Sequence, residues 1–212
     1  MNEAISILAG TAALIGFGHA LCGPDHYLPF IVMSKARNWS LMKTLWITFL
    51  CGLGHVLSSI TFGLIGAVLG MALGEIELLE AWRGNLAAQA LIIFGFTYCV
   101  WGLHRAYKKH PHNHPLQSKS ITPWILFTIF ALGPCEPLIP LIMYPAAEHS
   151  ISGVLLVSGI FAATTLLTML SVVCIGTLGI QFVKLGSIDR FSHALAGAAV
   201  CISGLAIQFM GL

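Results

Sequence analysis

Six apolar stretches, each long enough to cross a lipid bilayer as a helix, occupy most of this 212-residue sequence. A helix needs about 20 residues to cross a hydrocarbon core about 30 Å thick. Only 8% of the residues are charged, against roughly 25% in soluble globular domains. We therefore predict an all-α, polytopic membrane protein with a single transmembrane domain over residues 1–212. Its six predicted transmembrane helices cover approximately residues 5–33, 45–73, 86–104, 122–145, 151–182 and 191–212.

A short motif occurs twice, 110 residues apart: Gly23-Pro24-Asp25-His26 in the first half and Gly133-Pro134-Cys135-Glu136 in the second. The ends of the halves also agree, because Ile93-Phe94-Gly95 matches Ile202-Ser203-Gly204 at an offset of 109 residues. Each half then holds three helices, and an odd number of spans gives the two halves opposite orientations in the membrane. The expected units are an inverted repeat of about 1–104 and about 122–212, joined by a histidine-rich cytoplasmic linker of about 105–121.

The Gly-Pro pairs predict that the first and fourth helices are broken. Proline removes a backbone donor and clashes with the preceding turn, and glycine beside it loosens the same turn. Unwound backbone at membrane depth is tolerated only where protein buries it or where water reaches it. We therefore expect the two broken helices to line a cavity together, with the side chains of both motifs close to the axis that relates the halves.

Two imidazoles and a carboxylate lie within eight residues around the first Gly-Pro pair: His19, Asp25 and His26. This combination suits divalent first-row metals such as nickel, cobalt, copper and zinc. On an unbroken helix His19 and His26 would stand ~10.5 Å apart, too far to hold one ion. The break either brings them together or leaves them as successive stations on a path. We expect His55, in the next helix, to add a further imidazole.

The second motif adds a thiol and a carboxylate, Cys135 and Glu136. As ligands they would make the site softer and more selective for late transition metals. Asp25 and Glu136 are also candidate proton carriers, because metal binding requires deprotonated ligands. The sequence has no phosphate-binding Gly-Lys-Ser/Thr loop, so we expect a transporter that uses protons or the membrane potential rather than a nucleotide-hydrolysing enzyme. We expect no nucleic-acid partner and no permanently bound cofactor.

The sequence GHALCGPDH in one helix, followed by GLGHVLSS in the next, resembles the paired signature of the nickel/cobalt transporter superfamily. That superfamily includes the UreH-type urease accessory membrane proteins and short nickel permeases. The resemblance covers about residues 16–59 and implies metal recognition by His19, Asp25, His26 and His55. One departure is that five residues, rather than four, separate His19 from Asp25. The implied activity is transport of a divalent cation, nickel or cobalt first, with copper and zinc as alternatives.

Two other functions remain open. Gly133-Pro134-Cys135-Glu136-Pro137 resembles the Pro-Cys motif of thiol-disulfide membrane carriers of the cytochrome-c-biogenesis and DsbD type. Such a carrier needs a second thiol that can meet Cys135, and Cys22 is the only nearby substitute in the first motif. The third possibility is a membrane accessory protein that delivers metal without transporting it. A reversible Cys22–Cys135 disulfide would favour the redox relay.

Basic residues predict the orientation of the chain. Nine of the ten lysines and arginines lie after the first, third and fifth predicted helices. The remaining one, Arg83, falls in a predicted loop with Glu75, Glu77 and Glu80. By the positive-inside rule the nine face the cytoplasm, so we expect a multi-pass protein of the cytoplasmic (inner) membrane with both termini outside. The first apolar stretch lacks a basic leader and is therefore interpreted as a membrane helix rather than a signal peptide.

The predicted cytoplasmic linker contains a short histidine tract. Short histidine-rich tracts bind metals, so the tract is a possible accessory metal site. The alternative is a solvated linker whose lysines face anionic lipid. The tract's candidate ligands are His110, His112 and His114.

Overall fold

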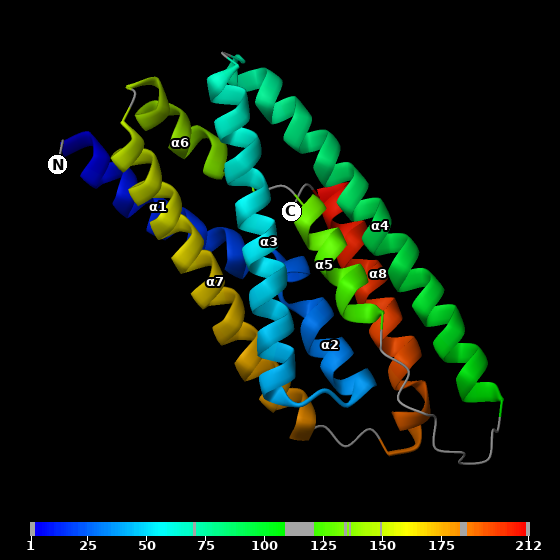
Figure 1. Ribbon diagram of the computed structural model, residues 1–212. Helices are drawn as coiled ribbons and strands as arrows, with labels where there is room; N and C mark the ends of the chain where they lie inside the picture. Colours follow the sequence, from blue (N-terminus) through cyan, green and yellow to red (C-terminus); the bar gives the residue numbers. More distant parts are fainter. Residues whose placement is uncertain are drawn as a thin grey trace.

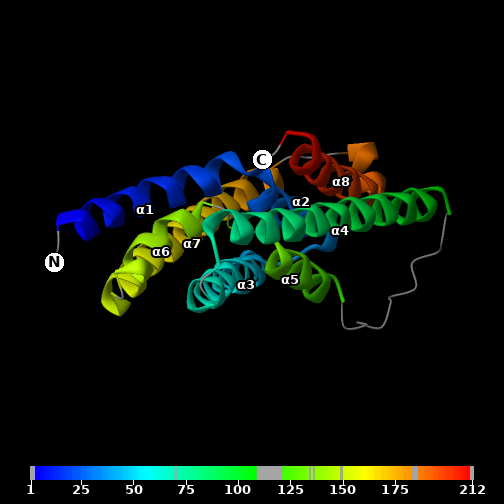
Figure 2. The same ribbon diagram turned by 90° about the horizontal axis from the view of Figure 1, so that it is seen from above.

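The computed structural model describes residues 3–69, 71–108, 121–133, 135, 137–148, 150–182 and 186–210. All regular structure in these ranges is helical, which confirms the predicted all-α fold. The helices form an elongated bundle in which α3 and α5 lie on one face and α1 and α8 on the opposite face (Figures 1 and 2). In chain order the elements are α1 (Glu3–Cys22), η1 (Pro24–His26), α2 (Leu28–Arg37), α3 (Leu41–Val68), α4 (Leu73–Tyr107), α5 (Thr122–Leu132), α6 (Leu138–Ala147), α7 (Ile151–Phe182), η2 (Gly186–Phe191) and α8 (Ser192–Met210).

Several of the helices have the length and composition of membrane spans. Within the described ranges, five segments are long and apolar enough to cross a bilayer, in agreement with a multi-pass membrane protein. The predicted span over 122–145 instead consists of two short helices, α5 and α6, neither of which crosses a bilayer alone. The five long segments are Glu3–Cys22, Leu41–Gly66, Leu73–Tyr107, Ile151–Phe182 and Asp189–Phe209.

A helix ends directly before the glycine of each Gly-Pro pair, as predicted. α1 ends at Cys22, and η1 and α2 follow after Gly23. In the second half α5 ends at Leu132 and α6 begins at Leu138, whose N–H donates to the Cys135 carbonyl oxygen at 2.9 Å. Both breaks lie in the interior of the bundle, away from its two ends (Figure 1). The chain therefore changes direction at the two places where the ligand-type residues occur.

α4 begins earlier than predicted, at Leu73 instead of about residue 86. Its first turn is capped, because Oε2 of Glu75 accepts a hydrogen bond from the Ala72 N–H at 3.1 Å. Beyond this turn, the Glu80 carboxylate and the Arg83 guanidinium form a buried ion pair. Two of the four charges that indicated a loop thus neutralise each other within the helix, and a third caps its first turn. The predicted loop is wrong because all of its charged residues lie in α4: Glu75, Glu77, Glu80 and Arg83.

α4 and α8 pack backbone to backbone along a row of glycines. A Cβ atom on Gly95 would collide with the Cys201 backbone, and one on Gly197 would collide with the Cys99 backbone. Small residues let membrane helices approach this closely, which favours van der Waals packing where the hydrophobic effect is absent. Because Gly95 faces Cys201 while Cys99 faces Gly197, the two helices run antiparallel. Their side-by-side position is visible in both views (Figures 1 and 2).

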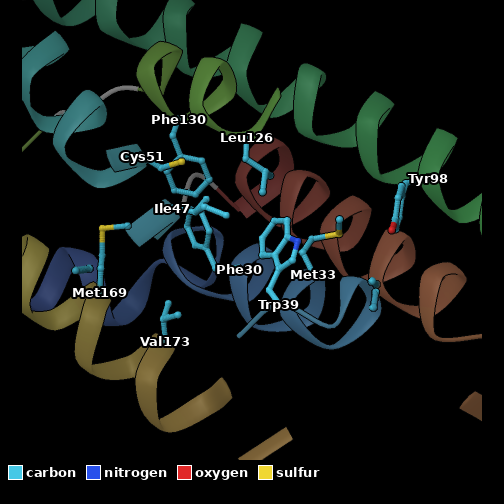
Figure 3. Packing of buried hydrophobic residues seen from close by; sticks show 13 residues of the cluster. Phe30, Met33, Trp39, Ile47, Cys51, Tyr98, Leu126, Phe130, Met169 and Val173 are labelled. Carbon is cyan, nitrogen blue, oxygen red and sulfur yellow. The ribbon is translucent and has the colours of Figure 1, made fainter. Parts of the chain in front are cut away.

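Two hydrophobic clusters flank the breaks. The first joins α2, α3, α5 and α7, and Figure 3 shows Phe30 of α2 beside Phe130 of α5, with ring centroids 4.7 Å apart. The second contains Val56, Cys135 and Phe161, together with apolar residues of α1 and α6. Each cluster thus includes a residue close to the second break, Phe130 in the first and Cys135 in the second. The breaks are consequently fixed between two packed regions of the bundle.

Candidate metal centre

Three histidines from different parts of the fold converge at the first break. His19 lies in the last turn of α1, His26 in η1 and His55 in the middle of α3. The ring centroid of His26 is 4.6 Å from that of His19 and 5.1 Å from that of His55. One ligand nitrogen of each ring lies within 4.8 Å of the others, as a shared metal ion requires. The break therefore brings His19 and His26 together, which decides between the two alternatives left open by their spacing.

Two of the imidazoles are oriented by a hydrogen bond at Nδ1. His26 donates from Nδ1 to the Asp25 carboxylate at 3.2 Å, and His55 donates from Nδ1 to the Phe130 carbonyl oxygen at 3.3 Å. A neutral imidazole that donates through Nδ1 presents a lone pair at Nε2. Both Nε2 atoms are buried and have no hydrogen-bond partner among the described residues. Such an arrangement, with one nitrogen oriented and the other vacant for a bond, is typical of metal-binding histidines.

Cys135 brings a thiol from the second break to the same place. Its Sγ lies 3.7 Å from Nε2 of His19, and the residue is completely buried. Its N–H donates to Oγ of Ser59 at 2.9 Å, which fixes the backbone of the break against α3. The three imidazoles form the group whose ligand atoms all lie within 4.8 Å of one another, and the thiol lies beside that group, in contact with His19. Imidazole nitrogens and a thiol sulfur are the donor types that late transition metals prefer.

A cavity of about 380 Å³ adjoins the histidine cluster. All three histidines and Asp25 line it on one side, and mostly apolar residues of α4, α5 and α8 line the rest. Near α8 it reaches Gln208, whose Nε2 donates to Oδ1 of Asn85 on α4 at 3.1 Å. The cluster is therefore accessible from a space inside the bundle, as the sequence predicted for two broken helices.

The glycine of each motif leaves room for a histidine ring. A Cβ atom on Gly23 would lie 2.5 Å from Nδ1 of His26, and one on Gly133 would lie 3.3 Å from Nδ1 of His55. Neither glycine has a positive φ, so space rather than backbone conformation explains the residue type. The repeated glycine thus serves the same purpose on both sides of the site.

The predicted site residues have different outcomes. His19, His26 and His55 come together, with Cys135 in contact with His19. Asp25 lines the cavity but bonds to His26, so its position is that of a carboxylate that orients a ligand. The other four predicted ligands lie outside the described residues: Glu136, His110, His112 and His114.

Sequence reasoning missed a polar network beside the second break. It consists of buried Glu80 and Arg83 on α4 and of Ser58 and Ser59 on α3. A usable signal was present, because an acidic and a basic residue three positions apart on an apolar helix can pair on one face. Assigning these residues to a loop hid that signal.

The cysteines are distributed unevenly around the site. All six lie in the described part of the chain, and no disulfide joins any two of them. Cys22, the second thiol that a redox relay would use, is exposed at the end of α1, whereas Cys135 is fully buried. The thiol-disulfide relay therefore stays a prediction from the sequence motif.

Comparison with known proteins identifies no family. No protein-family model matches this chain, and no curated protein or solved structure matches it. The resemblance of residues 16–59 to nickel/cobalt transporters thus stays a prediction from the two motifs.

Proposed function

We propose that this protein transports a divalent late transition-metal cation, nickel or cobalt first, across the cytoplasmic membrane. The observation that carries the proposal is the convergence of His19, His26 and His55 where an apolar helix breaks, with the thiol of the second break in contact with His19. Ionisable and metal-binding side chains are costly inside a membrane, by about 2.5–3.5 kcal/mol for a charged one on insertion scales. Their clustering is therefore expected to serve an ion.

The donor set selects the class of cation. Neutral imidazoles and a thiolate suit nickel, cobalt, copper and zinc, whereas magnesium and calcium prefer carboxylate, carbonyl and water oxygens. The only described carboxylate at the cluster, Asp25, is engaged with His26. We therefore expect hard cations to bind weakly and the late first-row metals to bind tightly.

The arrangement around the cluster favours movement of the ion over permanent storage. In transporters built from inverted repeats, the substrate site lies near mid-membrane where discontinuous helices meet. Counting α5 and α6 as one broken span gives six spans, three in each half. The contacts between helices fit this scheme. α1, in the first span of one repeat, packs against α7, the second span of the other, and α5 packs against α3 in the equivalent way. The antiparallel α4 and α8 would then be the third helices of the two repeats.

Charge supports an orientation for the proposed transporter. The described basic residues near the ends of α2 and α4 and near the starts of α3 and α8 lie at one end of the bundle in Figure 1. By the positive-inside rule this end would face the cytoplasm, with both termini outside. The cation would exchange its water ligands for imidazoles at the cluster, while Cys135 releases its proton on binding. Asp25 would keep His26 oriented as the ligands close around the ion.

Uptake into proteoliposomes tests the proposal. We expect the purified protein to accumulate Ni²⁺ or Co²⁺, and His26→Ala and His55→Ala to abolish uptake. His104→Ala removes an exposed imidazole at the far end of α4 and is the matched control. A protein that binds metal but moves none would be the delivery protein of the third alternative. Retained uptake in both cluster variants would contradict the proposal.

The redox relay is tested with the same preparation. Cys22→Ser should leave metal uptake unchanged, because Cys22 is exposed and lies outside the histidine cluster. If the protein instead relays electrons, Cys22→Ser should abolish disulfide exchange while His26→Ala leaves it nearly unchanged. Cys135→Ser does not discriminate, since both functions use that thiol.

A further inference from the structure

A buried ion pair lies beside the second break. Glu80 is fully buried and Arg83 is 4% exposed, and Nη1 of Arg83 donates to Oε1 of Glu80. Both residues belong to α4, one turn apart. Removing two charges from water costs several kcal/mol per ion, and a buried pair often contributes no net stability. A pair retained inside an apolar bundle therefore calls for a role besides stability.

A chain of hydrogen bonds connects this pair to Cys135. The N–H of Cys135 donates to Oγ of Ser59 at 2.9 Å, and Ser59 donates its own proton to Oε2 of Glu80 at 3.1 Å. The other carboxylate oxygen of Glu80 accepts from Arg83. The Cys135 backbone is thus connected through the Ser59 hydroxyl to the Glu80 carboxylate.

Arg83 extends the same network to both sides of the site. Its Nη2 donates to Oγ of Ser58 at 2.8 Å and to the carbonyl oxygen of Ala131 at 3.2 Å. Ser58 in turn donates to the carbonyl oxygen of His55 at 2.8 Å. The guanidinium thus ties the turn that carries His55 to the end of α5, whose last carbonyl groups lose their helical partners at the break.

The first break has a different kind of support. The His26 N–H donates to the Gly23 carbonyl oxygen at 3.1 Å, and the Tyr27 N–H donates to the Pro24 carbonyl oxygen at 3.4 Å. These bonds are local to the turn that carries the first-half ligands. Among the described contacts, the hydrogen bonds of the ion pair lead to the second break, which carries the thiol.

We infer that Glu80 and Arg83 are positioning residues that hold the Cys135 thiol against His19, so that the thiol completes the metal site. The inference rests on the proposed metal-binding function and extends it to a ligand-orienting charge pair. Groups that orient metal ligands typically change metal affinity about 10- to 100-fold when mutated. We expect a change in that range here, together with the loss of sulfur from the coordination of the metal.

Cobalt(II) absorption of the full-length protein in detergent tests the inference. A thiolate bound to Co²⁺ gives a charge-transfer band in the near ultraviolet, which imidazole ligands alone do not give. We expect this band in the wild type and its loss in Cys135→Ser. If the wild type binds no Co²⁺, the proposed function itself is contradicted. If it binds Co²⁺ without the band, the thiol is not a ligand and the positioning inference falls.

The discriminating variants leave Cys135 in place. Ser59→Ala removes the hydroxyl that links the Cys135 N–H to Glu80. Glu80→Gln combined with Arg83→Met removes the pair without leaving a lone charge. We expect each to lower the charge-transfer band at least severalfold and Co²⁺ affinity about tenfold or more. Ser203→Ala is the matched control, because Ser203 is 2% exposed and its Oγ bonds within α8.

The band separates positioning from a purely structural role. A structural role would lower the thermal unfolding temperature of the variants but leave the band of the folded, Co²⁺-bound protein at full strength. Wild-type band and affinity in Ser59→Ala would overturn the inference even if the double variant did not fold. Loss of the band in Ser59→Ala, with the control unchanged, would support it.

Discussion

Replacing Gly23 by alanine should disable the metal centre through a single methyl group. The added Cβ would lie 2.5 Å from Nδ1 of His26 and 2.9 Å from Oδ1 of Asp25, whereas ordinary contacts begin near 3.4 Å. The His26 ring must therefore move by about 1 Å, several times the ±0.2 Å tolerance of a metal–ligand distance. Overpacking of this kind costs about 1–3 kcal/mol of stability, so the protein should still fold.

The expected effect on binding is a loss of affinity of about 10- to 100-fold, because His26 loses both its place and its bond to Asp25. Competition titration with a chromophoric chelator would measure it for Ni²⁺ and Co²⁺. Gly133→Ala should have a smaller effect, since its Cβ would approach His55 only to 3.3 Å. Gly18→Ala is the control, because a Cβ there meets nothing within 4 Å. Wild-type affinity in Gly23→Ala would refute the role assigned to His26.

Three further predictions concern the surroundings of the site. Arg83→Met alone should lower the free energy of unfolding, measured by chemical denaturation, by about 3–5 kcal/mol, because it leaves Glu80 as an uncompensated buried charge. Adding Glu80→Gln should restore part of this loss, and equal stability of the single and double variants would contradict the prediction. Gly197→Val should prevent the close packing of α8 on α4 and lower the thermal unfolding temperature, whereas Gly179→Val, where a Cβ meets nothing within 4 Å, should not. If the tract collects ions, replacing its histidines, His110, His112 and His114, with asparagine should lower transport at limiting metal concentration but not at saturating concentration. Unchanged transport at every metal concentration would mean that the tract is only a linker.

Much of the architecture follows from hydropathy and from the Gly-Pro pairs. Both features are local, because a long apolar run requires a helix in lipid and proline removes the donor that continues it. The start of α4 could not be predicted in the same way. Its first turns carry charges that favour a loop, and the helix holds two of them, Glu80 and Arg83, as a buried ion pair.

The candidate residues of the proposed metal site were predictable by residue type but not by position. His19, Asp25, His26 and His55 stood out because polar ligands are rare in apolar helices. Their convergence depends on the angle at which η1 leaves α1 and on the packing of α3, neither of which has a sequence signal. The spacing of Glu80 and Arg83 indicated their pairing, but nothing in the sequence indicated their links to Ser58 and Ser59 or the link of Ser59 to Cys135, whose partners lie 21 to 76 residues apart in the chain.

X-ray absorption of the zinc-loaded protein tests the central claim most directly, because it reports the ligands around the ion. The proposed site predicts one zinc ion with three nitrogen neighbours at about 2.0–2.1 Å and one sulfur neighbour at about 2.3 Å. The sulfur should vanish in Cys135→Ser, and a nitrogen should be lost in His55→Ala. A shell of oxygen ligands without sulfur, or a spectrum unchanged in both variants, would contradict a metal centre built from His19, His26, His55 and Cys135.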